Sequence, residues 1–481
     1  MPYTGSPVEE SKLALPTRKI VPLIVACALF MQQMDSTALA TSLPSMAGSL
    51  GVTPLKLHLA ITSYLMSLAI FLPMSGWVAD KFGPRRIFCL AIGLFTLGSV
   101  LCGVSINLTT LVAARVIQGL GGAMMVPVGR LILVRSVEKN ELLSAMVLMN
   151  MTAIIGPAAG PLLGGAITSF ISWRWIFWIN VPAGILGIVL TLQFIRDLNK
   201  AEVNAFDWRG FVLTGFGFGC LMAALDSVSS QLGDNIMPLG LLFAGLITLA
   251  IYYVHSRIVS NPILDLRLFR LTSFRISVTG GSIFRLGFGA IPFLLPLLMQ
   301  VGFGYSPLKS GTITFISSAG SFGMRSISRR VIKKFGFRNI LIWNALITAG
   351  FMFMYGSFDQ STSRLFMMAV IFGGGVFRSL QMTSVNTIAF AEVNNVQMRD
   401  ATSMSQMAQR ISQVAGVALA ALILGLAGNG GAHLTVHAFS VAFCVLGGIS
   451  ALSLLLFWQL PLDAGAELAD RVSPPAAQHS R

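Results

Sequence analysis

The chain has 481 residues, of which 54% are apolar and only 11% are charged, and its mean hydropathy is +0.77. A soluble protein carries about 25% charged residues, so this composition excludes an ordinary soluble domain and indicates a protein embedded in lipid. The net charge of +15 does not indicate nucleic-acid binding, because the Lys and Arg residues lie in short loops between apolar runs.

The chain begins with a polar tail, residues 1–19, and the apolar run that starts at Ile20 is too long for the core of a signal peptide. This run is therefore predicted to be the first membrane span. A spanning helix needs about 20 apolar residues, and fourteen segments meet this condition. In chain order they lie near 20–42, 57–78, 87–106, 109–134, 143–167, 175–195, 210–228, 237–255, 276–300, 308–327, 338–357, 365–390, 402–426 and 436–458.

The distribution of positive charge predicts the orientation of these spans. With the N-terminus inside, 24 of the 33 Lys and Arg residues lie in inner segments and 4 lie in outer loops. Since inner loops of membrane proteins are enriched in Lys and Arg, both termini, including the tail 461–481, are expected in the cytoplasm.

Two loop sequences occur twice with the same spacing. KFGPRRI at 81–87 returns as KFGFRNI at 334–340, and GVTPLK at 51–56 returns as GYSPLK at 304–309, each with an offset of 253 residues. The offset corresponds to eight predicted spans, an even number, so the two halves have the same orientation and are parallel repeats.

These observations predict an all-α polytopic membrane protein with two related bundles of six helices. The N-terminal bundle is expected over 20–200 and the C-terminal bundle over 273–460, with two inserted spans and their flanking loops over 201–272.

Six segments carry more specific patterns. They read MDSTALATSLP (34–44), GWVADKFGPRR (76–86), Leu111 with Arg115, Gln118, Gly119, Gly121 and Gly122, GPAAGPLLGG (156–165), WRWIFWINVPAG (173–184) and FDWRG (206–210). Together they resemble the signatures of the major facilitator superfamily, and specifically of its fourteen-span drug:proton antiporter branch. The resemblance covers nearly the whole chain and is closest to a bacterial subgroup described only as multidrug-type transporters.

This resemblance implies the major facilitator fold and alternating access, with proton antiport as the energy source. It also implies that a cytoplasmic loop latches the halves in the outward-open state and that a fifth-span motif is of the antiporter type. The gating-loop residues are Gly76, Asp80, Gly83, Arg85 and Arg86. The fifth-span residues are Gly156, Pro157, Gly160, Pro161, Gly164 and Gly165. The first-span signature departs from the branch at Ala40, where an Asn is usual, so any role of that Asn is missing or is filled elsewhere.

Asp35 is the only acidic residue placed deep in a predicted span. At 1.5 Å per residue it lies about 8 Å from the outer face, and Arg115 lies about 9 Å from the same face. We therefore expect the two side chains to approach each other, with Gln118 on the same helix face as Arg115. Two interpretations remain open: a proton- or substrate-coupling carboxylate, or a fixed ion pair that holds spans together.

Three arginines lie inside spans of the second half, namely Arg285, Arg378 and Arg410, and polar residues lie near them in the sequence, namely Gln381, Asn386 and Gln413. One interpretation is that the arginines bond to these polar groups and to carbonyls. The other is a positive inner cavity that favours anionic or zwitterionic substrates.

No phosphate-binding G-x-x-x-x-G-K-[ST] loop occurs in the chain, so ATP is not the expected energy source. No cofactor, metal, nucleic acid or enzymatic activity is expected, and the partners are a small-molecule substrate, protons and the bilayer, with the chain as a monomer. The preferred function is a secondary transporter that exports drug-like or metabolite molecules across a bacterial inner membrane. The alternatives are a narrow-range metabolite exporter, a proton symporter of the same fold, or a membrane sensor or structural partner without transport.

Overall fold

The computed structural model describes residues 14–137, 139–197, 205–230, 237–394, 397–428 and 434–469, and no strand occurs among them. The long helices before the inserted pair are α1 (Ala14–Ala38), α3 (His58–Phe82), α4 (Pro84–Gly103), α5 (Leu108–Ser136), α6 (Lys139–Phe170) and α8 (Asn180–Phe194). The inserted pair is α9 (Trp208–Ser230) and α10 (Met237–Ile258). The long helices that follow are α11 (Thr272–Phe288), α13 (Pro307–Phe335), α14 (Phe337–Gly356), α15 (Arg364–Ile388), α16 (Met398–Ala427) and α17 (Val436–Phe457).

Shorter helical segments extend or connect these helices. They are η1 (Leu39–Ser42), α2 (Leu43–Leu50), η2 (Pro54–Leu57), α7 (Trp175–Trp178), η3 (Leu266–Arg270), α12 (Ile291–Leu297), the π-helical turn η4 (Leu298–Gly302) and η5 (Glu467–Ala469).

Each of the fourteen predicted spans coincides with a helix or with consecutive helical segments. Among the described residues, twelve helical segments are long and apolar enough to cross a membrane. The other two predicted spans, 143–167 and 308–327, coincide with α6 and α13, which are 32 and 29 residues long. Ser, Gly and Arg residues dilute the hydropathy of α13. The architecture is thus the predicted all-α polytopic fold with about fourteen spans.

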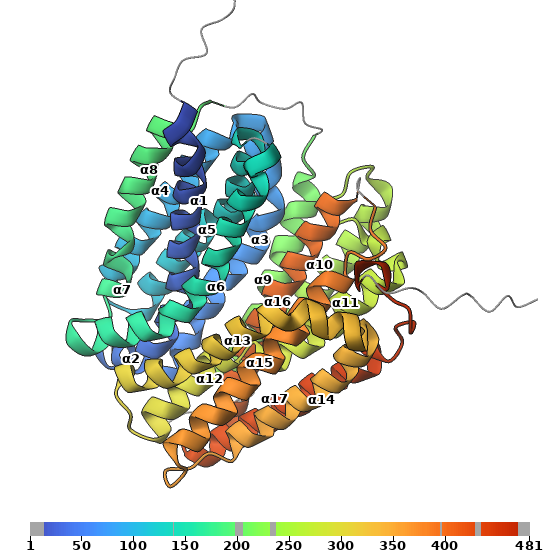
Figure 1. The fold of residues 1–481 in the computed structure, drawn as a ribbon. Coiled ribbons are helices and arrows are strands. Elements are labelled where there is room, and N and C mark those ends of the chain that lie inside the picture. The colour runs from blue at the N-terminus through green and yellow to red at the C-terminus, as the bar shows by residue number, and fades with distance from the viewer. Residues whose placement is uncertain are drawn as a thin grey trace, which may run out of the picture.

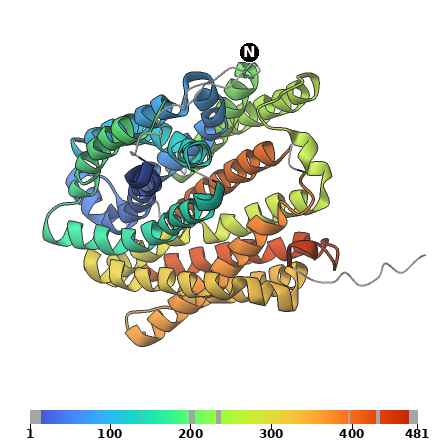
Figure 2. The same cartoon turned by 45° about the horizontal axis from the view of Figure 1, so that its top comes forward.

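The two halves repeat the same packing pattern. In the first half α1 packs on α6, α3 and α4 pack on α5, and α8 packs on α4. In the second half α11 packs on α16, α13 and α14 pack on α15, and α17 packs on α14. These pairs correspond one to one in chain order. In Figure 1 the blue-to-teal helices form one group and the yellow-to-red helices another, and Figure 2 shows the same separation from a second direction.

The repeated loops also share their backbone geometry. Gly83 and Gly336 have φ values of 96° and 79°, and their amides donate to the carbonyls of Ala79 and Ile332 at 3.0 and 2.8 Å. Arg85 donates to the carbonyl of Leu192 at the end of α8. Arg338, which is 253 residues later, donates to the carbonyl of Trp458 just after α17, at 3.0 Å. Each loop therefore ties the second and third long helices of its half to the sixth, as expected for parallel repeats.

The inserted helices pack against each other and extend the contact between the halves. Helix α9 also packs on α16 and on α3. Met66, Met222 and Val414 form a small buried cluster where the three helices meet. In Figure 1 the inserted pair (green) lies beside α16.

The halves contact each other along two pairs of helices, α6 with α13 and α3 with α16. We call the side with the loops 81–86 and 333–338 the basic end. At the opposite end the Leu308 amide donates to Ser169 Oγ at 3.1 Å, and Gln300 Nε2 donates to the carbonyl of Thr41 at 2.9 Å. At the basic end, Arg399 of α16 lies 3.5 Å from Asp80 of α3.

Candidate functional site

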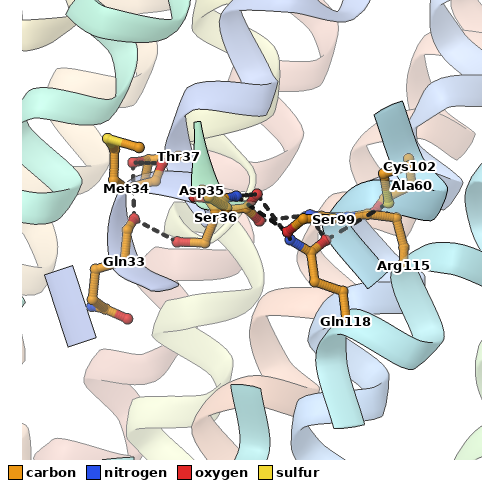
Figure 3. Close-up of polar contacts among 11 residues, drawn as sticks. Gln33, Met34, Asp35, Ser36, Thr37, Ala60, Ser99, Cys102, Arg115 and Gln118 are labelled. Atoms are coloured by element: carbon orange, nitrogen blue, oxygen red, sulfur yellow. Dashed lines mark hydrogen bonds and ion pairs between the residues drawn. The ribbon is translucent and has the colours of Figure 1, made fainter. Parts of the chain in front are cut away.

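The candidate site is centred on Asp35, whose side chain is fully buried in the last turn of α1. Arg115 of α5 donates to Asp35 Oδ2 at 2.6 Å and is itself only 1% exposed. Figure 3 shows the Asp35 carboxylate pointing from α1 towards Arg115 and Gln118 on α5. The structure thus brings together Asp35 and Arg115, which were predicted to lie at nearly the same depth in the membrane.

Two amide side chains complete the contacts of the carboxylate. Gln118 donates through Nε2 to Asp35 Oδ1 at 3.0 Å and to Ser99 Oγ at 2.8 Å, and it accepts from Arg115 at 2.6 Å. Asn180, the first residue of α8, donates to Asp35 Oδ1 at 3.0 Å and to Ser99 Oγ at 3.3 Å. Three donors from two helices therefore surround the carboxylate, and a buried charge needs such partners to be tolerated.

Arg115 is held by further contacts within the first half. Its Nε donates to the carbonyl of Ala60 at 3.0 Å, and its guanidinium carbon lies 4.2 Å from the centre of the Tyr64 ring. The ring of Phe177 lies 5.8 Å away on α7. The cation is desolvated, and in that condition a cation–π contact is worth about 2 kcal/mol. The pair is a charge-neutral cluster built on α1, α3, α5 and α8.

Asn180 and Ser99 were not among the predicted site residues. A signal for Asn180 existed, because it is the only Asn in the apolar run 175–195. The direction in which the Asn180 side chain points around the helix axis cannot be deduced from its depth in the membrane alone. Ala40 is buried in η1, and Asn180 supplies an amide group to Asp35 from a different helix.

The glycines of α6 form the contact surface for the part of α1 that carries Asp35. A Cβ atom on Gly156 would lie 2.6 Å from Gln33 Cβ, and one on Gly160 would overlap Thr37 Oγ1. A Cβ on Gly164 would overlap the carbonyl of Ala38. The stripe therefore permits the close approach of α6 to α1.

The next positions of the same motif face the other half. Gly165 of α6 lies against the backbone of Pro307 on α13. The carbonyl of Pro161 on α6 lies against Gly311, which is also on α13. One motif thus forms the contact with α1 on one side and the contact between the halves on the other. Pro157 lies inside α6 between the two glycines that contact Gln33 and Thr37.

The three second-half arginines occupy two different places. Arg285 of α11 is 3% exposed and donates to Asn386 Oδ1 at 2.7 Å. Arg410 of α16 bonds to Gln413 at 3.4 Å and lies close enough to Arg285 for electrostatic interaction.

Arg378 lies apart from this pair. It lies 3.5 Å from Ser321 Oγ and interacts electrostatically with Tyr355 and Arg325. Gln381 is fully buried inside the bundle, where it accepts from Asn344 at 3.0 Å and donates to the carbonyl of Leu341 at 3.2 Å.

The predicted gating loop makes ionic contacts within and between the halves. Asp80 accepts from Arg135 at 2.7 Å and lies 3.5 Å from Arg399. Arg399 also covers Gly76, where a Cβ would lie 2.9 Å from its guanidinium nitrogen. Arg85 lies 3.3 Å from Asp197, and the side chain of Arg86 is exposed. Neither Arg135 nor Arg399 was predicted as a partner.

Among the residues that the structure describes, no group of three His, Cys, Asp or Glu side chains could hold a metal ion.

An apolar groove of about 520 Å³ lies on the surface formed by α6, α7 and α8, next to Trp175, Trp178 and Pro182. Ile179 and Val181, the chain neighbours of Asn180, also line this groove.

Comparison with known proteins agrees with the fold and the motifs. The sequence model described as Major Facilitator Superfamily matches residues 25–393. "Putative multidrug resistance protein MdtD" of Serratia proteamaculans is 37% identical over 92% of this chain and 93% of its own length. The protein of the same name from Escherichia coli O6:H1 is 36% identical over 93% of this chain and 95% of its own length. The crystal structure of a D-xylose-proton symporter is similar with a TM-score of 0.66 and 14% identity, over 93% of this chain and 99% of that one.

Proposed function

The chain belongs to the Major Facilitator Superfamily and is a multi-pass membrane transporter of small molecules, and from this premise we propose that it exports its substrate by proton antiport. The relatives at 36–38% identity bear the name of a multidrug resistance protein. A drug-like molecule or a metabolite handled by efflux is therefore the proposed substrate.

The observation that carries this proposal is the burial of Asp35 between Arg115, Gln118 and Asn180. A carboxylate is stable there only while its charge is matched. Proton binding to Asp35 removes its charge and leaves Arg115 without a counter-charge. Loss of the proton restores the ion pair. Protonation is thereby linked to the arrangement of α1, α5 and α8 around Asp35.

The proposed movement is a rocking of the bundles 20–200 and 273–460 against each other, with the substrate between them. The contacts Asp80–Arg399 and Leu308–Ser169 lie at opposite ends of the interface. Alternating access would open one and close the other in turn. With both termini in the cytoplasm of a bacterial cell, the Asp80 contact closes the inner side and the Ser169 contact closes the outer side.

The test is a proton-flux assay in proteoliposomes with an imposed pH gradient, using the wild-type chain and the Asp35→Asn variant. Substrates from a panel of cationic, anionic and zwitterionic compounds should release protons through the wild type, and Asp35→Asn should abolish this release. Asp463→Asn is the control, since Asp463 is an exposed acid outside the candidate site and the gating loop, and it should behave as the wild type.

Two results would contradict the proposal. If folded Asp35→Asn exchanges protons at the wild-type rate, Asp35 has a structural role and coupling occurs elsewhere. If proton and substrate move in the same direction, the transporter is a symporter, which is the second candidate for this fold.

A further inference from the structure

We propose that Arg285 and Arg410 of the second half, together with Tyr64 of the first, form a binding site for small organic anions between the halves. The anion would carry two carboxylate, sulfonate or phosphate groups. This inference rests on the proposed export function and specifies the substrate class.

Arg285 is the first reason for the proposal. Its side chain is 3% exposed, its only hydrogen bond goes to the neutral amide of Asn386, and its Nε lacks any hydrogen-bond partner in the part of the chain that the structure describes. A buried guanidinium is costly unless an anion matches its charge. The unused Nε–H donor points to a ligand that accepts a charge-assisted hydrogen bond.

The position of Arg410 is the second reason. Gly416 brings α16 against the carbonyls of Arg285 and Leu286. Gln413, to which Arg410 bonds, packs against Gly289 at the end of α11, and the Arg285 and Arg410 cations interact electrostatically. Arg410 is partly exposed and bonds only weakly to Gln413. Neither arginine forms an ion pair with an Asp or Glu among the described residues. Two like charges repel at short range, and an anion between them removes this repulsion.

Tyr64 connects this pair to the Asp35 cluster. It is 1% exposed, its ring covers Arg115 at 4.2 Å, and it also lies within electrostatic range of Arg410. An anion held by Arg410 would therefore lie beside the residue that holds the Asp35 partner in place. Asp35 is already matched by Arg115, so its carboxylate is not free to pair with a cationic substrate.

The experiment is calorimetric titration of the full chain in nanodiscs with phthalate, benzoate and benzylammonium as probes. These share one aromatic ring and differ in charge. Phthalate should bind more tightly than benzoate, and benzylammonium should neither bind nor compete. Arg285→Gln and Arg410→Gln should each weaken phthalate binding at least tenfold, which is about 1.4 kcal/mol, and Arg285→Lys should recover part of the loss.

The control is Arg275→Gln, which removes the same charge from the same helix ten residues earlier, about 15 Å along the axis. Arg275 is exposed and should tolerate the change with wild-type phthalate affinity. Thermal unfolding of each variant identifies those that fold, and Arg285→Lys provides the measurement if the glutamine variant does not.

The outcomes separate this inference from the antiport proposal. If phthalate fails to bind the wild type, or binds both glutamine variants with unchanged affinity, the anion site is overturned even when Asp35→Asn abolishes proton release. If phthalate binding requires both arginines while no substrate releases protons, the anion site stands and proton antiport fails.

Discussion

Asp35 and Arg115 are mutually dependent, because each is buried almost completely and, among the described residues, each is the one opposite charge paired with the other. Removing one partner of such a pair leaves an unmatched buried charge, which costs about 3–5 kcal/mol. Removing both leaves only neutral groups.

We therefore predict that Arg115→Met destabilises the protein more than the double variant Asp35→Asn/Arg115→Met. The measurement is thermal unfolding in detergent, completed as a double-mutant cycle with Asp35→Asn. A double variant that loses the sum of the two single losses would show that the charges do not interact in the folded protein.

At the residue scale, the sequence could predict how deep in the membrane a side chain lies, but not which way it points around the axis of its helix. Counting residues from the span ends placed Asp35 and Arg115 at one level, and the structure places them 2.6 Å apart. The sequence also grouped Arg378 with Arg285 and Arg410 as arginines inside second-half spans, although Arg378 lies beside Ser321 and Tyr355. The direction of a side chain around the helix depends on tertiary packing, which no single span encodes.

Helix α6 approaches α1 so closely that side chains larger than hydrogen are excluded at Gly160. We predict that Gly160→Leu separates the two helices and destabilises the fold by about 1–3 kcal/mol, the usual cost of overpacking. Gly350→Leu in α14 is the control, since no atom lies within 4 Å of a Cβ placed there.

Thermal unfolding and substrate-driven flux are measured for both variants. Because α1 carries Asp35, Gly160→Leu should also reduce proton coupling. Equal behaviour of the two leucine variants would show that the α1–α6 approach tolerates extra volume.

The loops that precede α4 and α14 both require glycine, because the backbone there has a positive φ. Gly83 and Gly336 have φ of 96° and 79°, and a residue with a Cβ atom is strained there by about 1–3 kcal/mol. Gly83→Ala and Gly336→Ala should each lower the unfolding temperature by a similar amount. Gly323→Ala, in open space on α13, should not. A loss at only one of the two loops would show that they are not equivalent.

At the element scale, the pattern of apolar runs predicted where helices lie better than where they break. The predicted span 276–300 is interrupted, since α11 ends at Phe288 and α12 begins at Ile291. Gly287 precedes the break, Gly289 lies in it, and Pro292 and Pro296 follow it. Glycine weakens a helix and proline removes a backbone donor, so the signal was present, but hydropathy averaged over a whole span does not register it.

At the scale of the whole molecule, the contact between Ser169 and Leu308 joins the halves opposite the basic end. We predict that Ser169→Cys/Leu308→Cys, in a background without the five native cysteines, forms a disulfide that stops transport. A reducing agent should restore the rate, because rocking requires this contact to open.

Leu308→Cys alone is the control and should transport under oxidising conditions. The rate is followed by substrate-driven proton flux, and cross-linking by gel mobility after cleavage in a loop. Wild-type transport by the fully cross-linked protein would show that this end of the interface does not move.

The placement of the halves was beyond sequence-based prediction. The repeat at an offset of 253 residues predicted two bundles of the same orientation, and the repeated helix pairs agree with it. The pairing of α6 with α13 depends on small residues such as Gly165 and Gly311, whose contacts become visible only when both helices are placed.

The matching loops also carry a record of how the chain arose. Arg85 and Arg338 donate equivalent hydrogen bonds in the two halves, although α9 and α10 lie between the halves in the sequence. An ancestral gene that encoded six helices, duplicated head to tail, accounts for this correspondence. The inserted pair occupies the junction of the two copies, where extra chain leaves both copies intact. Replacing or removing the inserted pair α9 and α10 would therefore change the surface that these helices form, while leaving the bonds of Arg85 and Arg338 within each half unchanged.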